Sequence, residues 1–167
     1  MDPLFEADDN ATPLTEEETQ GLKQKWVTLR SELNELEMKG ILSAESWLST
    51  NTPADILTEK FLRSLHKRMF DSVWTWAGMF RTTERNIGVP PHTIPVKLKN
   101  LFDDVHFWIE NKTYPFNEIP VRFHHKLVAI HPFPNGNGRV SRLMADLLSR
   151  QIQGGLNRPG IAGDLKV

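Results

Sequence analysis

One segment, residues 131–142, holds most of the side chains that could perform chemistry. It reads His-Pro-Phe-Pro-Asn-Gly-Asn-Gly-Arg-Val-Ser-Arg. Pro132 disfavours helical geometry at His131, so a helix that precedes it should end there and leave the imidazole at its exposed end. A histidine in such a position can exchange a proton near neutral pH.

The glycines of this segment suit an anion. Gly136 and Gly138 permit positive φ and close backbone approach, so the N–H groups around Asn137 can form an anion-binding nest. A helix should follow, because apolar residues recur there at intervals of three and four. The positive end of its dipole would reinforce the attraction for phosphate. The apolar positions are Val140, Leu143, Met144, Leu147 and Leu148.

Two arginines lie in the first turn of this predicted helix. Arg139 and Arg142 are three residues apart, so they are neighbours on one side and can grip phosphate oxygens. A simpler interpretation is open for each piece: His131 as a helix cap, the glycines as an ordinary turn, and Arg142 as an ion-pair partner of Asp146. Together the pieces favour a site for a phosphorylated ligand.

The segment resembles the signature of Fic-domain proteins, HPF-x-[DE]-GNGR-x-x-R, with Asn135 where an acidic residue is usual. The resemblance covers about residues 25–150 and looks most like the bacterial subgroup called mobile mystery protein B. It implies an all-α fold, a Fic-type helical bundle with a short β-hairpin flap over the active site. It also implies a protein adenylyltransferase, which moves AMP from ATP to a Ser, Thr or Tyr hydroxyl of a target protein.

The resemblance assigns a role to each residue of the motif. His131 would be the general base, and Phe133 would anchor the loop in the core. Asn135 stands at the magnesium-binding position, where a neutral amide oxygen should hold Mg²⁺ more weakly than a carboxylate. Arg139 would bind near the β-phosphate and Arg142 would reach the γ-phosphate. The α- and β-phosphates of ATP would rest on Gly136, Asn137 and Gly138.

The N-terminal part of the chain divides into an arm and a helix. Residues 1–14 are polar and acidic, which is typical of a flexible arm. Thr15 and Glu18 form a capping box that predicts the start of a helix over residues 15–40. Gly40 suits the position just after its end.

The resemblance gives this helix a second role beside simple packing. Many Fic proteins carry an inhibitory helix with the pattern [ST]-x-x-x-E-[GN], whose glutamate pairs with the second arginine of the motif. Thr28 with Glu32 and Ser31 with Glu35 match its first five positions, although leucine follows each glutamate. Either carboxylate could occupy Arg142 and displace the γ-phosphate of ATP.

Residues 41–150 form the predicted Fic core. Ser43 should cap a short helix and Thr58 a longer one. Two further helices are expected, from Leu98 to Ile109 and from Pro120 to His131. Glycines and a proline after Arg150 predict an irregular tail over residues 151–167.

Residues 80–95 change character, because Gly88, Pro90 and Pro91 exclude a continuous helix. An exposed hairpin or extended flap is expected, and a passive connector is the alternative. By the resemblance, the flap aligns the backbone of the target by strand addition. Its tip would consist of Asn86, Ile87 and Gly88.

Composition excludes several other classes. The 167 residues suit one domain, and the net charge of −1 argues against nucleic acid as a direct partner. The chain has no cysteine, and its polar N-terminus and lack of long apolar runs argue against a signal peptide or membrane span. We expect a cytoplasmic protein whose partners are the target and an antitoxin-like regulator.

Two classes of function stay open from the sequence. The first is the adenylyltransferase held inactive by its own N-terminal helix, including Fic enzymes that use another nucleotide or remove AMP. The second is a non-catalytic nucleotide-binding or partner-binding Fic module, in which Asn135 has weakened the metal site.

Overall fold

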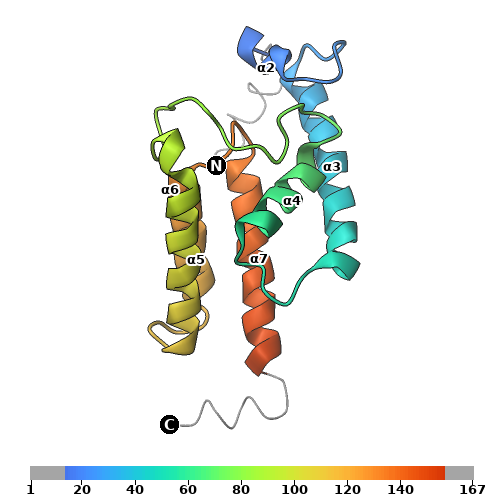
Figure 1. Cartoon of the computed structure of the whole chain (residues 1–167). Helices are drawn as coiled ribbons and strands as arrows, with labels where there is room; N and C mark the ends of the chain where they lie inside the picture. The colour runs from blue at the N-terminus through green and yellow to red at the C-terminus, as the bar shows by residue number, and fades with distance from the viewer. Residues whose placement is uncertain (1–13, 157–167) are drawn as a thin grey trace, which may run out of the picture. The chain divides into compact units, whose positions relative to one another are not determined.

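The protein, described here by a computed structural model over residues 14–156, is built from helices (Figure 1). Within these residues no β-strand forms, and Leu22 and Trp74 make an isolated bridge. The all-α expectation is therefore confirmed, whereas the β-hairpin expected within residues 80–95 is absent. The described chain divides into two compact units, one of residues 14–52 and 63–79 and the other of residues 53–62 and 80–156.

The first unit contains α2 (Glu16–Gln20), α3 (Arg30–Asn51) and most of α4 (Glu59–Phe70). The Oγ1 atom of Thr15 accepts the backbone N–H of Glu18 at 3.2 Å, as the capping signal predicts. The single helix expected over residues 15–40 is wrong, because α2 ends at Gln20 and α3 begins at Arg30.

Gly40 lies inside α3 and does not end it. A Cβ atom added there would overlap the backbone carbonyl oxygen of Met69 in α4, so the glycine lets the two helices approach closely. The expected stop at Gly40 and the expected new helix at Ser43 are therefore both wrong. Packing against α4 sustains α3 through a residue of low helix propensity.

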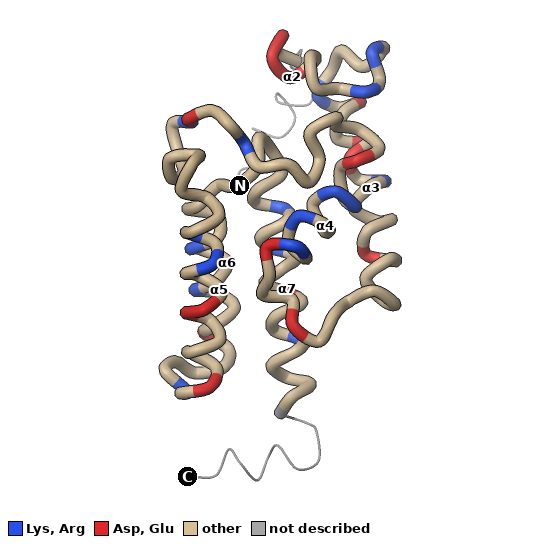
Figure 2. The backbone as a smooth tube through the Cα atoms, in the orientation of Figure 1, with Lys and Arg blue, Asp and Glu red and all other residues tan. Residues whose placement is uncertain are grey.

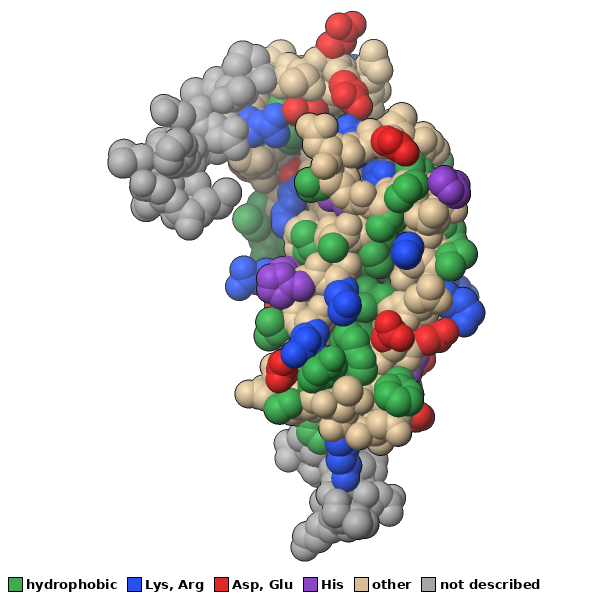
Figure 3. Space-filling model, turned by 90° about the vertical axis from the view of Figure 1, so that its left-hand side faces the viewer, with side chains coloured by type: hydrophobic (Ala, Val, Ile, Leu, Met, Phe, Trp, Pro, Cys, Tyr) green, Lys and Arg blue, Asp and Glu red, His purple; other side chains and the backbone are tan. Residues whose placement is uncertain are grey.

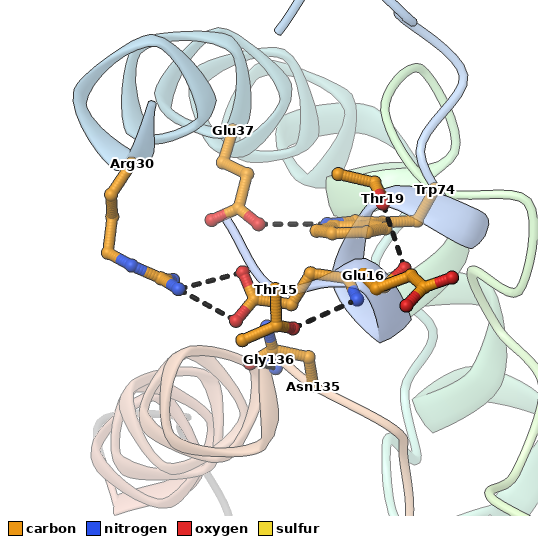
Figure 4. A network of polar contacts seen from close by, with 9 residues as sticks. Thr15, Glu16, Thr19, Arg30, Glu37, Trp74, Asn135 and Gly136 are labelled. Atoms are coloured by element: carbon orange, nitrogen blue, oxygen red, sulfur yellow. Dashed lines mark hydrogen bonds and ion pairs between the residues drawn. The ribbon is translucent and has the colours of Figure 1, made fainter. Parts of the chain in front are cut away.

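Two polar contacts hold the first unit together (Figure 4). The carboxylate of Glu37, which is 3% exposed, accepts a hydrogen bond of 2.8 Å from the indole Nε1 of Trp74. Arg30 at the start of α3 forms an ion pair of 2.7 Å with Glu18 of α2. Because buried polar groups are costly without partners, the first contact fixes where α3 meets the segment after α4.

The second unit contains a 3₁₀ turn (η1, Pro91–Thr93), α5 (Ile94–Glu110), α6 (Ile119–Ile130) and α7 (Asn137–Leu156). Helix α6 packs against both α5 and α7. Proline at the start of α6 confirms the predicted helix start at Pro120. The fully buried side chains of this unit include Ile94, Leu98, Phe123, Leu127, Phe133 and Met144.

The start of α4 and the end of α7 can be compared with the sequence predictions. Thr58 Oγ1 accepts the N–H of Phe61 at 3.1 Å, so the cap predicted for α4 is confirmed. Helix α7 continues to Leu156, so the irregular tail expected from residue 151 is wrong over residues 151–156. Two glycines weaken a helix only slightly when a long amphipathic part already packs. Residues 1–13 and 157–167, with most of the expected arm and tail, lie outside the described residues.

The surface of the described residues is mixed in character. Basic and acidic positions both occur along α4 and α5 (Figure 2). Apolar side chains reach the surface among charged ones on the face drawn in Figure 3, and Val96, Phe107 and Val121 of α5 and α6 are each more than half exposed. Among residues 14–156, no helix is both long and apolar enough to cross a membrane.

Candidate active site

His131 closes α6 in the left-handed conformation, with φ 53° and ψ 62°. Its backbone N–H donates to the carbonyl of Leu127 at 3.3 Å, which completes the last turn of the helix. Pro132 follows and cannot continue the helix. The predicted helix end at His131 is thus confirmed to within one residue.

The imidazole of His131 is set up to be neutral at pH 7. Burial and the positive charges of Arg81 and Arg85 lower its pKa from the ordinary value of 6.5. Its Nδ1 atom is buried and has no hydrogen-bond partner within the described part of the chain. A neutral imidazole carries the lone pair that a general base needs.

The loop after His131 is held by its own side chains. Phe133 is fully buried, and its ring centroid lies 5.6 Å from that of Phe80. The side-chain amide of Asn137 accepts the N–H of Phe133 and donates to its carbonyl, both at 2.8 Å. Gly136 adopts a positive φ of 77°, and its carbonyl accepts the N–H of Val140 at 3.0 Å to open α7.

The start of α7 presents an open surface to an anion. A Cβ atom added to Gly138 would meet no atom within 4 Å. Arg139 is half-buried and Arg142 is exposed. The positive charge of Arg142 also helps to lower the pKa of His124 on α6, after burial and the neighbouring His125. This end of a long helix can therefore receive a phosphate from solvent.

The residue at the expected metal position does not make a magnesium site by itself. The Oδ1 atom of Asn135 accepts the backbone N–H of Gly136 at 2.7 Å, which uses part of its capacity as a ligand. It is a neutral donor, and in residues 14–156 no group of three His, Asp or Glu side chains is placed to hold a metal ion. The donor set does not fit a preformed Mg²⁺ site.

The residues proposed to register the target pass beside the histidine. A Cβ atom added to Gly88, whose φ is +99°, would lie 2.8 Å from the Cβ atom of His131. Asn86 and Ile87 precede it, and Ile87 is 61% exposed. The segment is irregular and lacks the expected strands, yet it brings its tip to the site.

The two glutamates proposed as inhibitory belong to the first unit. Glu32 lies in the first turn of α3, where its Oε1 atom accepts the backbone N–H of Leu29 at 3.1 Å. Glu35 is exposed on the same helix. Glu32 therefore has a local role, because its carboxylate caps the backbone N–H of Leu29 at the start of α3.

Sequence reasoning missed Arg81. This residue is 3% exposed, and its guanidinium donates to backbone carbonyls on both sides of the site, including that of His131 at 2.5 Å. A lone basic residue between Phe80 and Thr82 carries no periodicity or spacing signal. Only the folded chain shows that its charge is buried.

Comparison with known proteins places these observations in a family. The Fic/DOC family matches residues 56–149, which is more than half of the chain. The protein adenylyltransferase Fic of Culex quinquefasciatus is 39% identical over 101 residues, which cover 56% of this chain and 20% of the mosquito protein. The chain thus spans about a fifth of the length of the curated relatives it matches.

Solved structures agree on the fold. A Fic-1 fragment from Caenorhabditis elegans is 28% identical with a TM-score of 0.54, over 69% of this chain and 35% of that one. The BepC protein of Bartonella tribocorum, solved with bound AMPPNP, has a TM-score of 0.62 at 20% identity. The match covers 84% of this chain and 74% of BepC. The second likeness concerns the fold alone. The mobile mystery protein B subgroup and a bacterial source stay predictions.

Proposed function

Because the chain belongs to the Fic/DOC family, we propose that it transfers AMP from ATP to a hydroxyl side chain of a target protein. The observation that carries this proposal is the placement of His131. Its imidazole has a lowered pKa and directly follows α6, and the loop after it leads to the start of α7, where a Cβ atom added to Gly138 would meet no atom within 4 Å. The relatives named as protein adenylyltransferases support the same chemistry.

ATP would bind at residues 136–142. The backbone N–H groups at the start of α7 would bind the α- and β-phosphates, and the open space over Gly138 lets them approach. Arg139 would contact the region of the β-phosphate and Arg142 the γ-phosphate. Arg139 lies in the first turn of α7 and Arg142 in the second, so both place positive charge near the proposed phosphate site.

The reaction follows from these positions. Neutral His131 accepts the proton of a Ser, Thr or Tyr hydroxyl as the hydroxyl oxygen attacks the α-phosphorus of ATP. A new P–O bond to the target forms, the bond between the α-phosphorus and the bridging oxygen breaks, and pyrophosphate leaves. Backbone N–H groups and arginines stabilise the charge that builds on the phosphates.

Magnesium accompanies the nucleotide in this proposal. Because the neutral amide of Asn135 already accepts a hydrogen bond, most of the ligands of Mg²⁺ would be phosphate oxygens and water. We assign no step of the reaction to a metal held by the protein.

The segment with Asn86, Ile87 and Gly88 would align the target. Its exposed backbone passes directly beside His131, so a target segment that pairs with it would present its hydroxyl to the imidazole. Addition of an extended segment to exposed backbone is a general way to bind peptides independently of most side chains. An antitoxin-like partner would act on this system as a separate protein, and the whole would operate in the cytoplasm.

The N-terminal part of α3 would regulate the site. A carboxylate from Glu32 or Glu35 that pairs with Arg142 would displace the γ-phosphate of ATP and hold the α-phosphorus away from its reactive position. Glu32→Gln is the informative variant. Glutamine removes the charge but can still accept the N–H of Leu29, so the start of α3 keeps this hydrogen bond.

The test uses cell lysate with ATP labelled on the α- or the γ-phosphorus. We compare the wild-type chain, Glu32→Gln, Glu35→Gln and the double variant, each with and without His131→Ala. Transfer of the α-label alone, strongest in a glutamate variant and lost with His131→Ala, is expected. Transfer of the γ-label would mean phosphoryl transfer. If every variant binds ATP and transfers neither label, the non-catalytic module favoured by the neutral Asn135 is the better account.

A further inference from the structure

Arg81 is a charged residue buried almost completely, with 3% of its surface exposed. Burial of a guanidinium group is costly unless its N–H groups find acceptors. Within the described residues, its four hydrogen bonds all go to backbone carbonyls, so the side chain holds the backbone of two segments. A buried cation that binds only backbone carbonyls suggests a role in holding the backbone near His131.

The acceptors lie on two segments that are far apart in the sequence, residues 83–89 and residues 130–131. On one side, Nε donates to the carbonyl of His131 at 2.5 Å and Nη2 to that of Ile130 at 3.2 Å. On the other side, Nη1 donates to the carbonyl of Thr83 at 3.1 Å and Nη2 to that of Val89. One guanidinium thus ties the end of α6 to both arms of the segment that passes the site.

Backbone contacts reinforce this connection. The N–H of Arg81 donates to the carbonyl of Pro132 at 2.9 Å, and that of Val89 donates to the carbonyl of Ile130 at 3.3 Å. A Cβ atom added to Gly88 would lie 2.5 Å from Nη2 of Arg81 and 2.8 Å from the Cβ of His131. The segment therefore touches the histidine through a position that only glycine fills easily.

His131 needs such support because its backbone is left-handed, at φ 53°. That conformation is uncommon for residues other than glycine and persists where surrounding contacts fix it. The carbonyl of His131 points to the Nε of Arg81, and a hydrogen bond from a charged donor is a strong one. The direction of the imidazole depends on this backbone.

We propose that Arg81 is a positioning residue, which holds His131 in its left-handed conformation and keeps residues 83–89 beside it so that the target and the base stay in register. This inference rests on the proposed role of His131. Arg81 and Arg85 are the charged groups that act on His131, so the same contact keeps a fixed cation beside the imidazole.

The experiment compares Arg81→Met, which removes the charge and the donors, with Arg81→Lys, which keeps the charge but loses the planar fork. Three properties are measured on the folded chain: the titration of His131 by NMR, hydrogen exchange of the Val89 amide, and the apparent KM and kcat of AMP transfer from ATP with total lysate protein as the acceptor. Arg122→Met is the control, because Arg122 is also bonded in this unit but pairs with Glu118 at the start of α6.

We expect Arg81→Met to raise the pKa of His131 toward 6.5, to speed exchange at Val89 at least tenfold, and to raise KM while lowering kcat. Arg81→Lys should leave the titration of His131 near that of the wild type while exchange at Val89 is still faster. The control should change none of these. If Arg81→Met does not fold, hydrogen exchange of the Val89 amide in Arg81→Lys tests the proposal instead. An exchange rate equal to that of the wild type would overturn it.

A merely structural role gives a different result. Arg81→Met would then lower the melting temperature, while the folded protein would keep the wild-type titration of His131, exchange at Val89 and kcat, and this outcome overturns the proposal. The titration and exchange measurements need no activity. If the wild-type chain transfers no AMP, the proposed function fails, yet these two readouts still test the contact between Arg81 and His131.

Discussion

The side-chain amide of Asn137 forms two hydrogen bonds with the backbone of Phe133, one as acceptor and one as donor, each 2.8 Å long. Asn137 therefore imitates a paired peptide group and closes the loop between α6 and α7. The residue is 4% exposed, and both polar groups of its side chain are bonded to Phe133, so the side chain serves the loop rather than a ligand. This asparagine shapes the loop that we propose to bind the nucleotide.

Replacement of Asn137 should destabilise the fold. Asn137→Ala removes both hydrogen bonds to the buried backbone of Phe133, which should lower the free energy of unfolding by about 2–4 kcal/mol. Asn137→Asp keeps the acceptor but places a buried carboxylate oxygen against the carbonyl of Phe133, so its loss at pH 7 should be at least as large. Urea denaturation measures both values, and wild-type stability for Asn137→Ala would show that the two bonds contribute nothing.

Gly138→Ala should separate binding from stability. The added Cβ atom meets no protein atom within 4 Å, and alanine favours the helix, so stability should be unchanged or higher by up to about 1 kcal/mol. The same Cβ would enter the space proposed for the phosphates, so the Kd for ATP should rise about tenfold or more, or about 1.4 kcal/mol. Calorimetric titration with ATP measures the Kd of both chains. An unchanged Kd would contradict the proposal that the phosphates bind beside Gly138.

Stability should depend on the histidines of the site. The pKa values of His131 and His124 are lowered from 6.5 in the folded chain, so below pH 6.5 the unfolded chain binds more protons. Their contribution is therefore complete above 6.5 and is lost as the pH falls below that value. Denaturation at about pH 7.5 and 5.5 measures the loss. His131→Gln should show a smaller loss of stability between these two pH values. A loss equal to that of the wild type would mean that the pKa of His131 is not lowered in the folded chain.

Replacement by alanine should change the stability of the fold in opposite directions at two helical glycines, Gly40 and Gly154. Gly40→Ala would force the carbonyl of Met69 away and should destabilise the chain by about 1–3 kcal/mol, despite the better helix propensity. Gly154→Ala is the matched change, since its Cβ meets no atom within 4 Å, and it should be neutral or stabilising by up to about 1 kcal/mol. Thermal denaturation compares them. Equal effects would mean that α3 and α4 do not pack closely at Gly40.

Local chemistry made the second unit predictable. Pro120 at the start of α6, Pro132 after its end, and the apolar stripe of α7 each act within one or two turns, so the sequence reports them directly. Gly136 likewise adopts the positive φ expected of a turn glycine. The order of helix, loop and helix around residues 131–142 follows from these signals.

Long-range packing explains the errors. Gly40 looks like a helix stop until Met69 is seen against it, and the segment after Phe80 looks like a hairpin until Arg81 is seen to bind its carbonyls. Met69 lies on another helix, and Arg81 also binds the carbonyls of Ile130 and His131 at the end of α6, so both errors involve partners from distant parts of the chain. The buried charge of Arg81 was invisible for the same reason, since isolated residues carry no periodic pattern.

The most direct measurement is the rate of AMP transfer from ATP by a chain that carries Glu32→Gln and Glu35→Gln, with and without His131→Ala, together with the Kd of each chain for ATP. If His131 is the general base, the alanine variant should lose about 10²–10⁴-fold in rate while its Kd stays within about threefold. Transfer that continues at the same rate without His131 would contradict the account.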